Sequence, residues 1–224
     1  APMEDRLAIE TRDRTRFEVQ ERSTTIEPRP MTGGQALVAS IIANDIDTLF
    51  ALPGVQLDGA FDALYEEQER IRVIHPRHEQ AAAYMADGYA RVSGEPAVTL
   101  LHCGPGLANG LANIHNAKRA RVPMVNIVGD QATYHKPFNP PLAQDTQALA
   151  KTVSHFVKTS KKAKHVGRDA ALAIQSARTA PGHIATLILP SDASWKKNKK
   201  IAPALPVPKQ LKINTKAIRK AAKI

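Results

Sequence analysis

The chain has 224 residues and is 43% hydrophobic, which is enough to bury one sizeable α/β core with extensions but leaves no room for two full domains. Cys103 is the only cysteine, so an intrachain disulfide and a cysteine-rich zinc site are excluded, and a reducing compartment is favoured. No segment approaches the roughly 18 consecutive apolar residues of a membrane span, and the first thirty residues lack the apolar run of a secretory signal. We therefore expect a soluble cytoplasmic protein with no membrane partner.

The formal net charge of +10 is concentrated at the C-terminal end of the chain. Residues 196–224 hold ten lysines and arginines and no acid, so the remainder is formally neutral. The run KKNKK at 196–200 could contact phosphates, but no aromatic residues are interleaved with its lysines and no nucleic-acid-binding motif accompanies it. The prolines of APALPVPKQ at 202–210 favour a semi-rigid spacer. We expect 196–224 to be a linker and nucleic acid not to be a partner.

From Thr32 onward, helix-like and strand-like patterns alternate. Thr32 to Ile42 has helical spacing, and the apolar run at 47–52 stops at a proline and a glycine, as a buried strand does. In chain order, a helix is then expected at 57–68, a strand at 71–75, a helix within 77–94, a strand at 97–101, a helix at about 107–119, strands at 123–128 and 155–159, a helix at about 168–179 and a strand at 184–189. This alternation predicts an α/β fold, with about six strands in a mostly parallel sheet and helices on both faces.

Ligands of such sheets gather at the carboxyl ends of the strands. Three stretches are expected there: LPGVQ at 52–56, HPRHE at 75–79 and HCGPGLANG at 102–110. Gly104 and Gly106 permit a close approach of the backbone to a ligand, and Pro105 stiffens the turn between them. When the GPG sequence is considered alone, a tight strand-to-helix turn explains it equally well.

Taken together, these stretches make residues 31–195 resemble the N-terminal pyrimidine-binding domain of thiamine-diphosphate enzymes, in the group of acetolactate synthase large subunits and benzoylformate decarboxylase. The resemblance rests on FALPG at 50–54, HEQAAAYMADGYARVSGEPA at 78–97, LLHCGPGLANGLANIHNAKRARVPMVNIVGD at 100–130 and APGHIATLILPSD at 180–192. It implies thiamine diphosphate as the cofactor, a 2-oxo acid as the substrate, and decarboxylation or carboligation as the reaction. Residues 1–30 precede it and are expected to be an N-terminal extension.

The resemblance gives Glu79 a catalytic role. In this family a glutamate before the small-residue helix hydrogen-bonds N1′ of the cofactor's aminopyrimidine and activates the cofactor. The alternative is a structural acid at a helix N-terminus, where it would stabilise the helix by about 0.3–1 kcal/mol. The residues that the resemblance places around the pyrimidine end of the cofactor are Pro53, Gly54, Glu79, Gly104, Pro105, Gly106 and Asn109.

His102 bears most directly on the type of reaction. A histidine before this turn also occurs in benzoylformate decarboxylase, where its family role is proton transfer to substrate or intermediate, a role that suits histidine near neutral pH. Acetolactate synthases generally carry a small hydroxyl residue or similar there. The substrate-contacting serine of the decarboxylase is replaced here by Val55, so both resemblances are incomplete. A purely structural histidine remains the alternative to a catalytic one.

The half of the family site that holds Mg²⁺ and the diphosphate has no counterpart in this sequence, because the GDG motif with its downstream Asn is reduced to GDQ at 129–131. We therefore expect a fragment or separately encoded subunit that is inactive alone and has no metal site of its own, with Mg²⁺ entering only through another domain or chain. The expected partners are further copies of the chain or a complementary diphosphate-domain chain. Gly88, inside a helix, indicates close packing, which the resemblance places at a subunit interface and which ordinary helix-on-sheet packing would also explain.

Two other functions are compatible with the sequence. A non-catalytic interaction module, or a truncated remnant, would keep the small-residue helices without catalysis. A dinucleotide-binding domain would use GPGLANG as its glycine-rich turn and Asp130 as its acid. Against the dinucleotide alternative, the glycines are spaced G-x-G-x-x-x-G, and they follow a third strand rather than a first βα turn.

Overall fold

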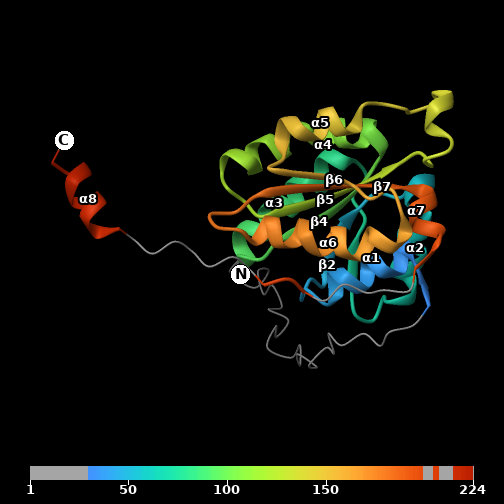
Figure 1. The fold of residues 1–224 in the computed structure, drawn as a ribbon, viewed down its shortest axis with the longest axis horizontal. Helices are drawn as coiled ribbons and strands as arrows, with labels where there is room; N and C mark the ends of the chain where they lie inside the picture. Colours follow the sequence, from blue (N-terminus) through green and yellow to red (C-terminus); the bar gives the residue numbers. More distant parts are fainter. Residues whose placement is uncertain (1–29, 199–203, 207–213, 224) are drawn as a thin grey trace, which may run out of the picture.

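The computed structural model describes residues 30–198, 204–206 and 214–223, and its centre is a parallel sheet of six strands (Figure 1). The strand order is β3-β2-β4-β5-β7-β6, and every neighbouring pair is parallel. The strands are β2 (Thr48–Ala51), β3 (Arg72–Ile74), β4 (Ala97–His102), β5 (Met124–Asp130), β6 (Phe156–Thr159) and β7 (Ile184–Pro190). The predicted α/β fold with about six parallel strands is confirmed.

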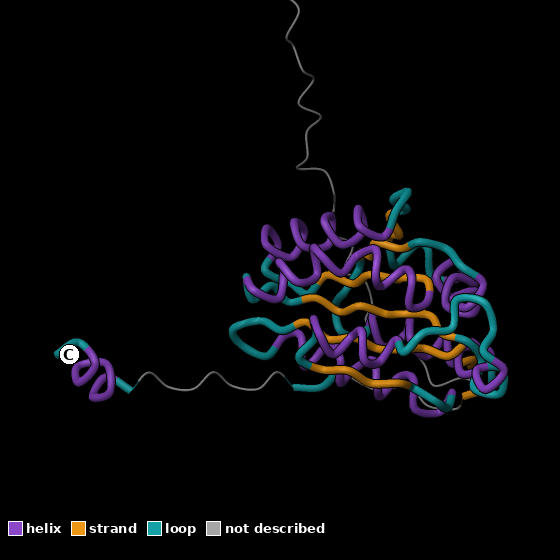
Figure 2. Tube along the Cα trace, turned by 90° about the horizontal axis from the view of Figure 1, so that it is seen from above, coloured by secondary structure: helices purple, strands orange, loops and turns teal. Residues whose placement is uncertain are grey.

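Helices cover both faces of the sheet. One face carries α1 (Gly33–Ile42), α2 (Asp58–Glu66), α6 (Ala163–Arg178) and α7 (Ser191–Trp195), and the other carries α3 (Glu79–Ser93), α4 (Cys103–Arg119) and α5 (Thr146–Val153). Two layers of helix with the strands between them are visible in Figure 2. Successive residues of a strand point to opposite faces, so Leu100 of β4 packs in the core under α1, and Leu101 packs in the core under α3 and α4.

Local sequence sets where the main helices begin and end. Thr32 and Gln35 form a reciprocal capping box at the start of α1, with each side chain bonded to the backbone N–H of the other residue. The helix α3 ends at Gly94, whose φ of 75° lies in the left-handed region that glycine adopts without strain. The buried side of α3 consists of Glu79 and four alanines, Ala82, Ala83, Ala86 and Ala90, which let α4 approach closely.

Along the carboxyl edge of the sheet, the connections that follow neighbouring strands diverge to opposite faces at three places. The strand β2 is followed by α2 on one face, whereas its neighbours β3 and β4 are followed by α3 and α4 on the other. The same divergence occurs between β5, which leads to α5, and β7, which leads to α7. Ligands of parallel sheets bind at such points. The fold therefore presents candidate ligand positions on either side of β2 and between β5 and β7.

Several boundaries differ from the sequence expectations. The helix expected from about 107 begins at Cys103, so the GPG sequence lies in the first turn of α4 rather than in a loop before it. The segment between β5 and β6 contains α5, which the proline-bearing and polar sequence did not suggest. Gly88 faces outward with open space where a Cβ would stand, so close packing within this chain does not explain it. Ordinary helix-on-sheet packing was therefore the wrong explanation for this glycine.

The C-terminal segment contains two short elements. Lys197–Asn198 forms β8, which pairs antiparallel with β1 (Met31–Thr32), and Thr215–Ala221 forms the exposed helix α8. The proposed linker at 196–224 stays a prediction, as do the domain limits, and most of the extension at 1–30 lies outside the described residues. Within the described parts of the chain, no helix is both long enough and apolar enough to span a membrane.

Candidate functional site

Glu79 is the first residue of α3, and its side chain is buried at the carboxyl edge of the sheet, with the residue 9% exposed. The side-chain amide of Asn109, on α4, donates a hydrogen bond to Oε2 of Glu79 at 2.9 Å. The other oxygen, Oε1, faces Gly106, where an added Cβ would lie only 2.8 Å away. Glycine at 106 therefore makes room for the carboxylate. Among the described residues, Oε1 has no hydrogen-bond partner.

His102 ends β4 and lies beside the turn that follows β2. Its imidazole ring rests against Gly54, where a Cβ would overlap the ring atoms, so glycine is required by close approach rather than by backbone conformation. Nε2 of His102 is hydrogen-bonded to Oε1 of Gln56. The amide of Gln56 donates in turn to Oε1 of Gln131 at 3.2 Å. His102 is thus held by a polar chain that begins after β2 and continues after β5.

The junction between β4 and α4 contains a residue in an unusual conformation. Cys103 has a φ of 58° and is fully buried. Burial, reinforced by the negative charge of Asp130, raises the pKa of the Cys103 thiol to about 11, so the side chain stays protonated near neutral pH. The next residue, Gly104, packs against the side chain of Gln144, which a Cβ at position 104 would overlap. The start of α4 therefore fits closely against the segment leading into α5.

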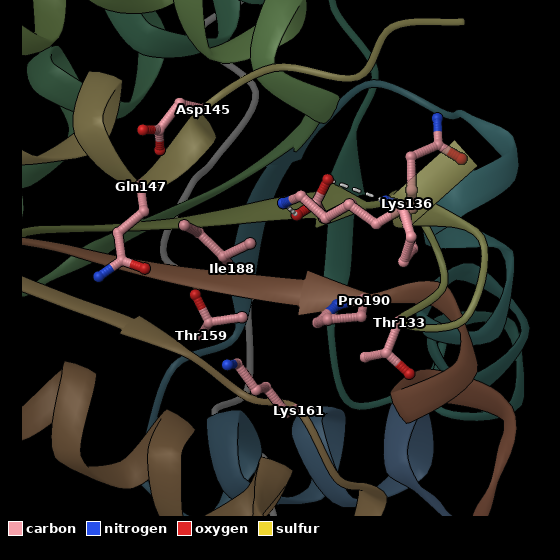
Figure 3. A pocket seen from close by; sticks show the side chains of 11 residues that line it. Thr133, Lys136, Asp145, Gln147, Thr159, Lys161, Ile188 and Pro190 are labelled. Carbon is pink, nitrogen blue, oxygen red and sulfur yellow. Dashed lines mark hydrogen bonds and ion pairs between the residues drawn. The ribbon is translucent and has the colours of Figure 1, made fainter. Parts of the chain in front are cut away.

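A cavity of about 460 Å³ opens where the connections after β5 and β7 diverge, beyond the ends of β5, β6 and β7 (Figure 3). Buried Asp130 accepts from Lys136 Nζ at 2.6 Å and from the backbone N–H of Gln131 at 2.9 Å. Lys161 lies on the other side of Ile188 from Lys136 and has no partner within the described part of the chain. The charges of Asp130 and Lys136 therefore neutralise each other, whereas the charge of Lys161 is not neutralised by a described residue.

Asp192 fixes the loop that forms one wall of this cavity. It accepts two hydrogen bonds from Thr133, at 2.9 Å from the backbone N–H and 2.8 Å from Oγ1, and one from Lys196 Nζ at 2.8 Å. Burial acts to raise the pKa of the Asp192 carboxyl, but the hydrogen bonds from Lys196 and Thr133 outweigh it, and the pKa is lowered. The carboxylate form therefore ties the loop after β5 to α7.

The structure brings together most of the site residues predicted from the sequence. Glu79, Gly106 and Asn109 form one cluster, and Gly54 and His102 form another at the same edge of the sheet. Pro53 is exposed at the end of β2, and Pro105 is partly buried in the first turn of α4. Across residues 30–198 and the two short described stretches beyond, no cluster of three His, Cys, Asp or Glu residues could hold a metal ion.

Sequence reasoning missed the glutamines at this edge. Gln56, Gln131 and Gln144 contact His102, Gln56 and Gly104, respectively. Gln131 directly follows β5, and Gln56 stands two residues after Gly54 in the turn beyond β2, so a position just after a strand near a glycine was the available signal. The cavity residues come from separate segments, including the ends of three strands and α5, so the linear sequence does not group them.

Comparison with known proteins gives matches that agree with this geometry. The family model described as "Thiamine pyrophosphate enzyme, N-terminal TPP binding domain" matches residues 31–154. The chain is 47% identical over 176 residues to "Putative acetolactate synthase large subunit IlvX" of Mycobacterium tuberculosis, an alignment that covers 79% of this chain and 34% of that protein. It is 31% identical over 171 residues to "Acetolactate synthase large subunit IlvG" of the same species, which covers 76% of this chain and 31% of the relative.

A shorter match relates the chain to a protein with a different named reaction. "Probable 2-ketoarginine decarboxylase AruI" of Pseudomonas aeruginosa is 41% identical over 99 residues, which is 44% of this chain and 17% of that protein. The chain thus spans about a third or less of the length of these relatives. The family match covers more than half of the chain and includes both residue clusters at the sheet edge. The chain therefore belongs to the thiamine pyrophosphate enzymes, with residues 31–154 matching their N-terminal TPP-binding domain.

Proposed function

We propose that this chain supplies the pyrimidine-binding half of the active site of a thiamine-diphosphate enzyme that acts on a 2-oxo acid, as a decarboxylase or as an acetolactate synthase-like carboligase. The single observation that carries the proposal is the buried Glu79 carboxylate, with Oε2 held by Asn109 and Oε1 directed at Gly106. A helix-stabilising glutamate needs neither burial nor a fixed free oxygen. A group that exchanges a proton with a bound ring needs both.

The residues at this edge fit the pyrimidine end of the cofactor. Gly54 and Gly106 let the His102 ring and the Glu79 carboxylate take positions that a Cβ would block, and Asn109 leaves one carboxylate oxygen available. The diphosphate end is different, because no metal-binding cluster occurs within the described residues. We therefore propose that Mg²⁺ and the diphosphate are held by another domain or chain, and that this chain alone binds the cofactor weakly.

Glu79 and His102 have separate roles in this proposal. Glu79 holds and exchanges a proton at Oε1, facing the pyrimidine ring, while Asn109 fixes the carboxylate orientation. Thiamine diphosphate, when bound, would supply a nucleophilic carbon for reaction with a 2-oxo acid. His102, at the end of β4, exchanges a proton with the substrate. Val55, 71% exposed in the turn after β2, gives that part of the site an apolar rather than a hydroxyl-bearing surface.

The partner in this proposal binds the outer face of α3. Tyr84, Met85 and Val92 are 53%, 46% and 91% exposed there, and Gly88 between them leaves open space for an approaching backbone. We propose a second copy of the chain, or a chain carrying the diphosphate domain, as the protein that covers this face. The cytoplasm is the compartment we propose for it.

The Glu79 carboxylate also argues against a dinucleotide-binding domain. The glycine-rich stretch at the start of α4 faces Glu79 through Gly106 and Gln144 through Gly104. A pyrophosphate placed on these glycines would meet a buried carboxylate, which repels it. The position suits a neutral or proton-sharing ring better than a dianion.

The test uses the full chain with a separately expressed diphosphate-binding domain from a relative. Calorimetry with thiamine diphosphate and Mg²⁺ should detect binding only when both proteins are present, and pyruvate or benzoylformate should then be consumed. A Glu79→Gln chain should lose about 100-fold or more of turnover. Glu69→Gln, at an exposed position of the same residue type, is the matched control. Equal turnover by the Glu79 variant would exclude the catalytic role, and absent binding in every mixture would leave a non-catalytic interaction module.

A further inference from the structure

Four groups at the carboxyl edge of the sheet form one continuous chain of hydrogen bonds. Nε2 of His102 bonds to Oε1 of Gln56, and Nε2 of Gln56 donates to Oε1 of Gln131 at 3.2 Å. Nε2 of Gln131 donates to the backbone carbonyl of Pro141 at 2.8 Å. The four residues come from three separate parts of the fold: the end of β4, the turn after β2, and the loop that follows β5.

The backbone carbonyl of Pro141 determines the donor-to-acceptor direction of these hydrogen bonds. A backbone carbonyl only accepts, so Gln131 must turn its NH₂ group toward Pro141 and its oxygen toward Gln56. Gln56 must then present its NH₂ group to Gln131 and its oxygen to His102. An amide oxygen cannot donate, so the ring nitrogen that meets it must carry the proton. Reversing either amide would leave two acceptors or two donors facing each other at the carbonyl or between the glutamines.

We propose that Gln56 and Gln131 are positioning residues that hold neutral His102 as the Nε2–H tautomer and so make Nδ1 the nitrogen that accepts a proton. Nδ1 has no hydrogen-bond partner within the described part of the chain, and the ring does not cap the helix that follows it. The assignment of tautomer rests on the hydrogen bonds alone. Its consequence for proton transfer rests on the proposed function of His102.

Burial and ion pairing make this arrangement rigid. Gln131 is 4% exposed, and its backbone N–H donates to Oδ1 of Asp130 at 2.9 Å. Asp130 is itself bonded to Lys136 at 2.6 Å. Gln131 is therefore anchored through its backbone to Asp130 and through its side chain to Pro141. On the opposite side, Gly54 lets the ring of His102 lie flat against the backbone. These contacts oppose rotation of the ring, and the fixed amides oppose a change of tautomer.

Nitrogen NMR on the full chain measures the tautomer directly. With ¹⁵N-labelled histidine, at a pH where His102 is neutral, the wild-type ring should give two widely separated nitrogen resonances, with the proton on Nε2. In Gln56→Met and in Gln131→Met, the two resonances should shift toward each other, because the ring then exchanges between tautomers. Gln56→Glu keeps an acceptor at His102 but loses the donor to Gln131, so the proton should stay on Nε2 although the bond between positions 56 and 131 is lost. Gln147→Met, at an exposed cavity position outside the chain of hydrogen bonds, is the matched control.

The outcomes separate this inference from the proposed function. A wild-type Nδ1–H ring, or a Met variant of either glutamine that folds and keeps the wild-type pattern, would overturn it. In mixtures with the diphosphate domain, Gln56→Met should lower kcat about 100-fold and Gln131→Met about tenfold, with KM little changed and the pH profile of kcat altered. If no mixture turns over any substrate, the proposed function fails while the NMR result still decides the tautomer.

Discussion

The side-chain amide of Asn109 fixes one oxygen of Glu79 at 2.9 Å, although the two residues lie on different helices. Replacing Asn109 with Ala leaves a buried carboxylate without its donor, which should lower the free energy of unfolding by about 1–2 kcal/mol. Asn116→Ala, at an exposed position of the same helix, controls for the change in helix propensity. Urea denaturation of the two variants measures the difference. Equal stabilities would show that the Asn109 bond contributes nothing.

Gly106→Ala tests whether the space in front of Glu79 is required. The added Cβ would stand 2.8 Å from Oε1 and would push the carboxylate away from its position. We expect cofactor binding by the complemented chain to weaken about tenfold or more, with the helical content of the protein preserved. Calorimetry and far-UV circular dichroism measure the two properties. Wild-type affinity in a folded Gly106→Ala chain would argue against a ligand at this oxygen.

Gly88→Ala should have opposite effects on folding and on association. A Cβ there meets nothing among the residues that the structure describes, so the change should stabilise α3 by up to about 1 kcal/mol in the monomer. If a second copy packs on this face, the same methyl group should weaken the association. Urea denaturation of dilute protein measures the first effect, and sedimentation equilibrium over a range of concentrations measures the second. Val92→Glu should also weaken association, without the gain in stability.

Lys136→Met should destabilise the protein, because Asp130 would remain as a buried carboxylate with only a backbone donor. The side chain of Lys136 is 45% exposed and that of Asp130 is 3% exposed, so we expect a loss of about 2–3 kcal/mol. Lys161→Met, at the same cavity but without a partner among the described residues, should change the free energy of unfolding by less than about 0.5 kcal/mol. A similar loss in both variants would contradict a specific role for the Asp130–Lys136 pair.

His155 should make the stability depend on pH. Its ring stacks on that of His183 with the centroids 4.4 Å apart. Partial desolvation of this largely exposed ring, and then the charges of His183, Lys118 and Arg121, lower the pKa of His155 in the folded state below the ordinary 6.5. This contribution to stability is therefore complete above pH 6.5 and is lost as the pH falls through the folded-state pKa.

His155→Gln should consequently flatten the decline in stability as the pH falls below about 6.5, when compared with the wild type and with a change at a second exposed histidine, His165→Gln. Urea denaturation at half-unit pH steps gives the slopes. An unchanged slope in the His155 variant would place the pH dependence elsewhere.

The alternation of the sequence was sufficient to predict the sheet because most of its strands are apolar and lie next to Pro or Gly. The run before Pro53, for example, became β2, and IATLIL became the core of β7. The helix α5 was missed because only Leu149, Ala150 and Val153 mark its inner side, and the preceding segment is rich in proline and polar residues. A short helix of this kind depends on packing against α4 more than on its own pattern.

The candidate site was predictable only in part. Glu79, Gly106 and Asn109 stand in recognisable motifs, and the structure brings them together. The bond between Gln56 and Gln131 joins residues 75 positions apart, and its direction depends on a carbonyl in a loop. Such a relation is a property of tertiary structure, so no periodicity or spacing in the sequence reveals it.

The antiparallel pairing of Met31 with Asn198 brings the two ends of the main body side by side. A segment attached before Met31 and one attached after Asn198 therefore leave the body from the same corner. Residues 31–198 should therefore be suitable for insertion into another protein, because both of their ends can be joined at a single loop of the recipient protein. New ends could equally be opened in an exposed loop and the old ones joined by a short connection, which makes the domain a suitable subject for circular permutation.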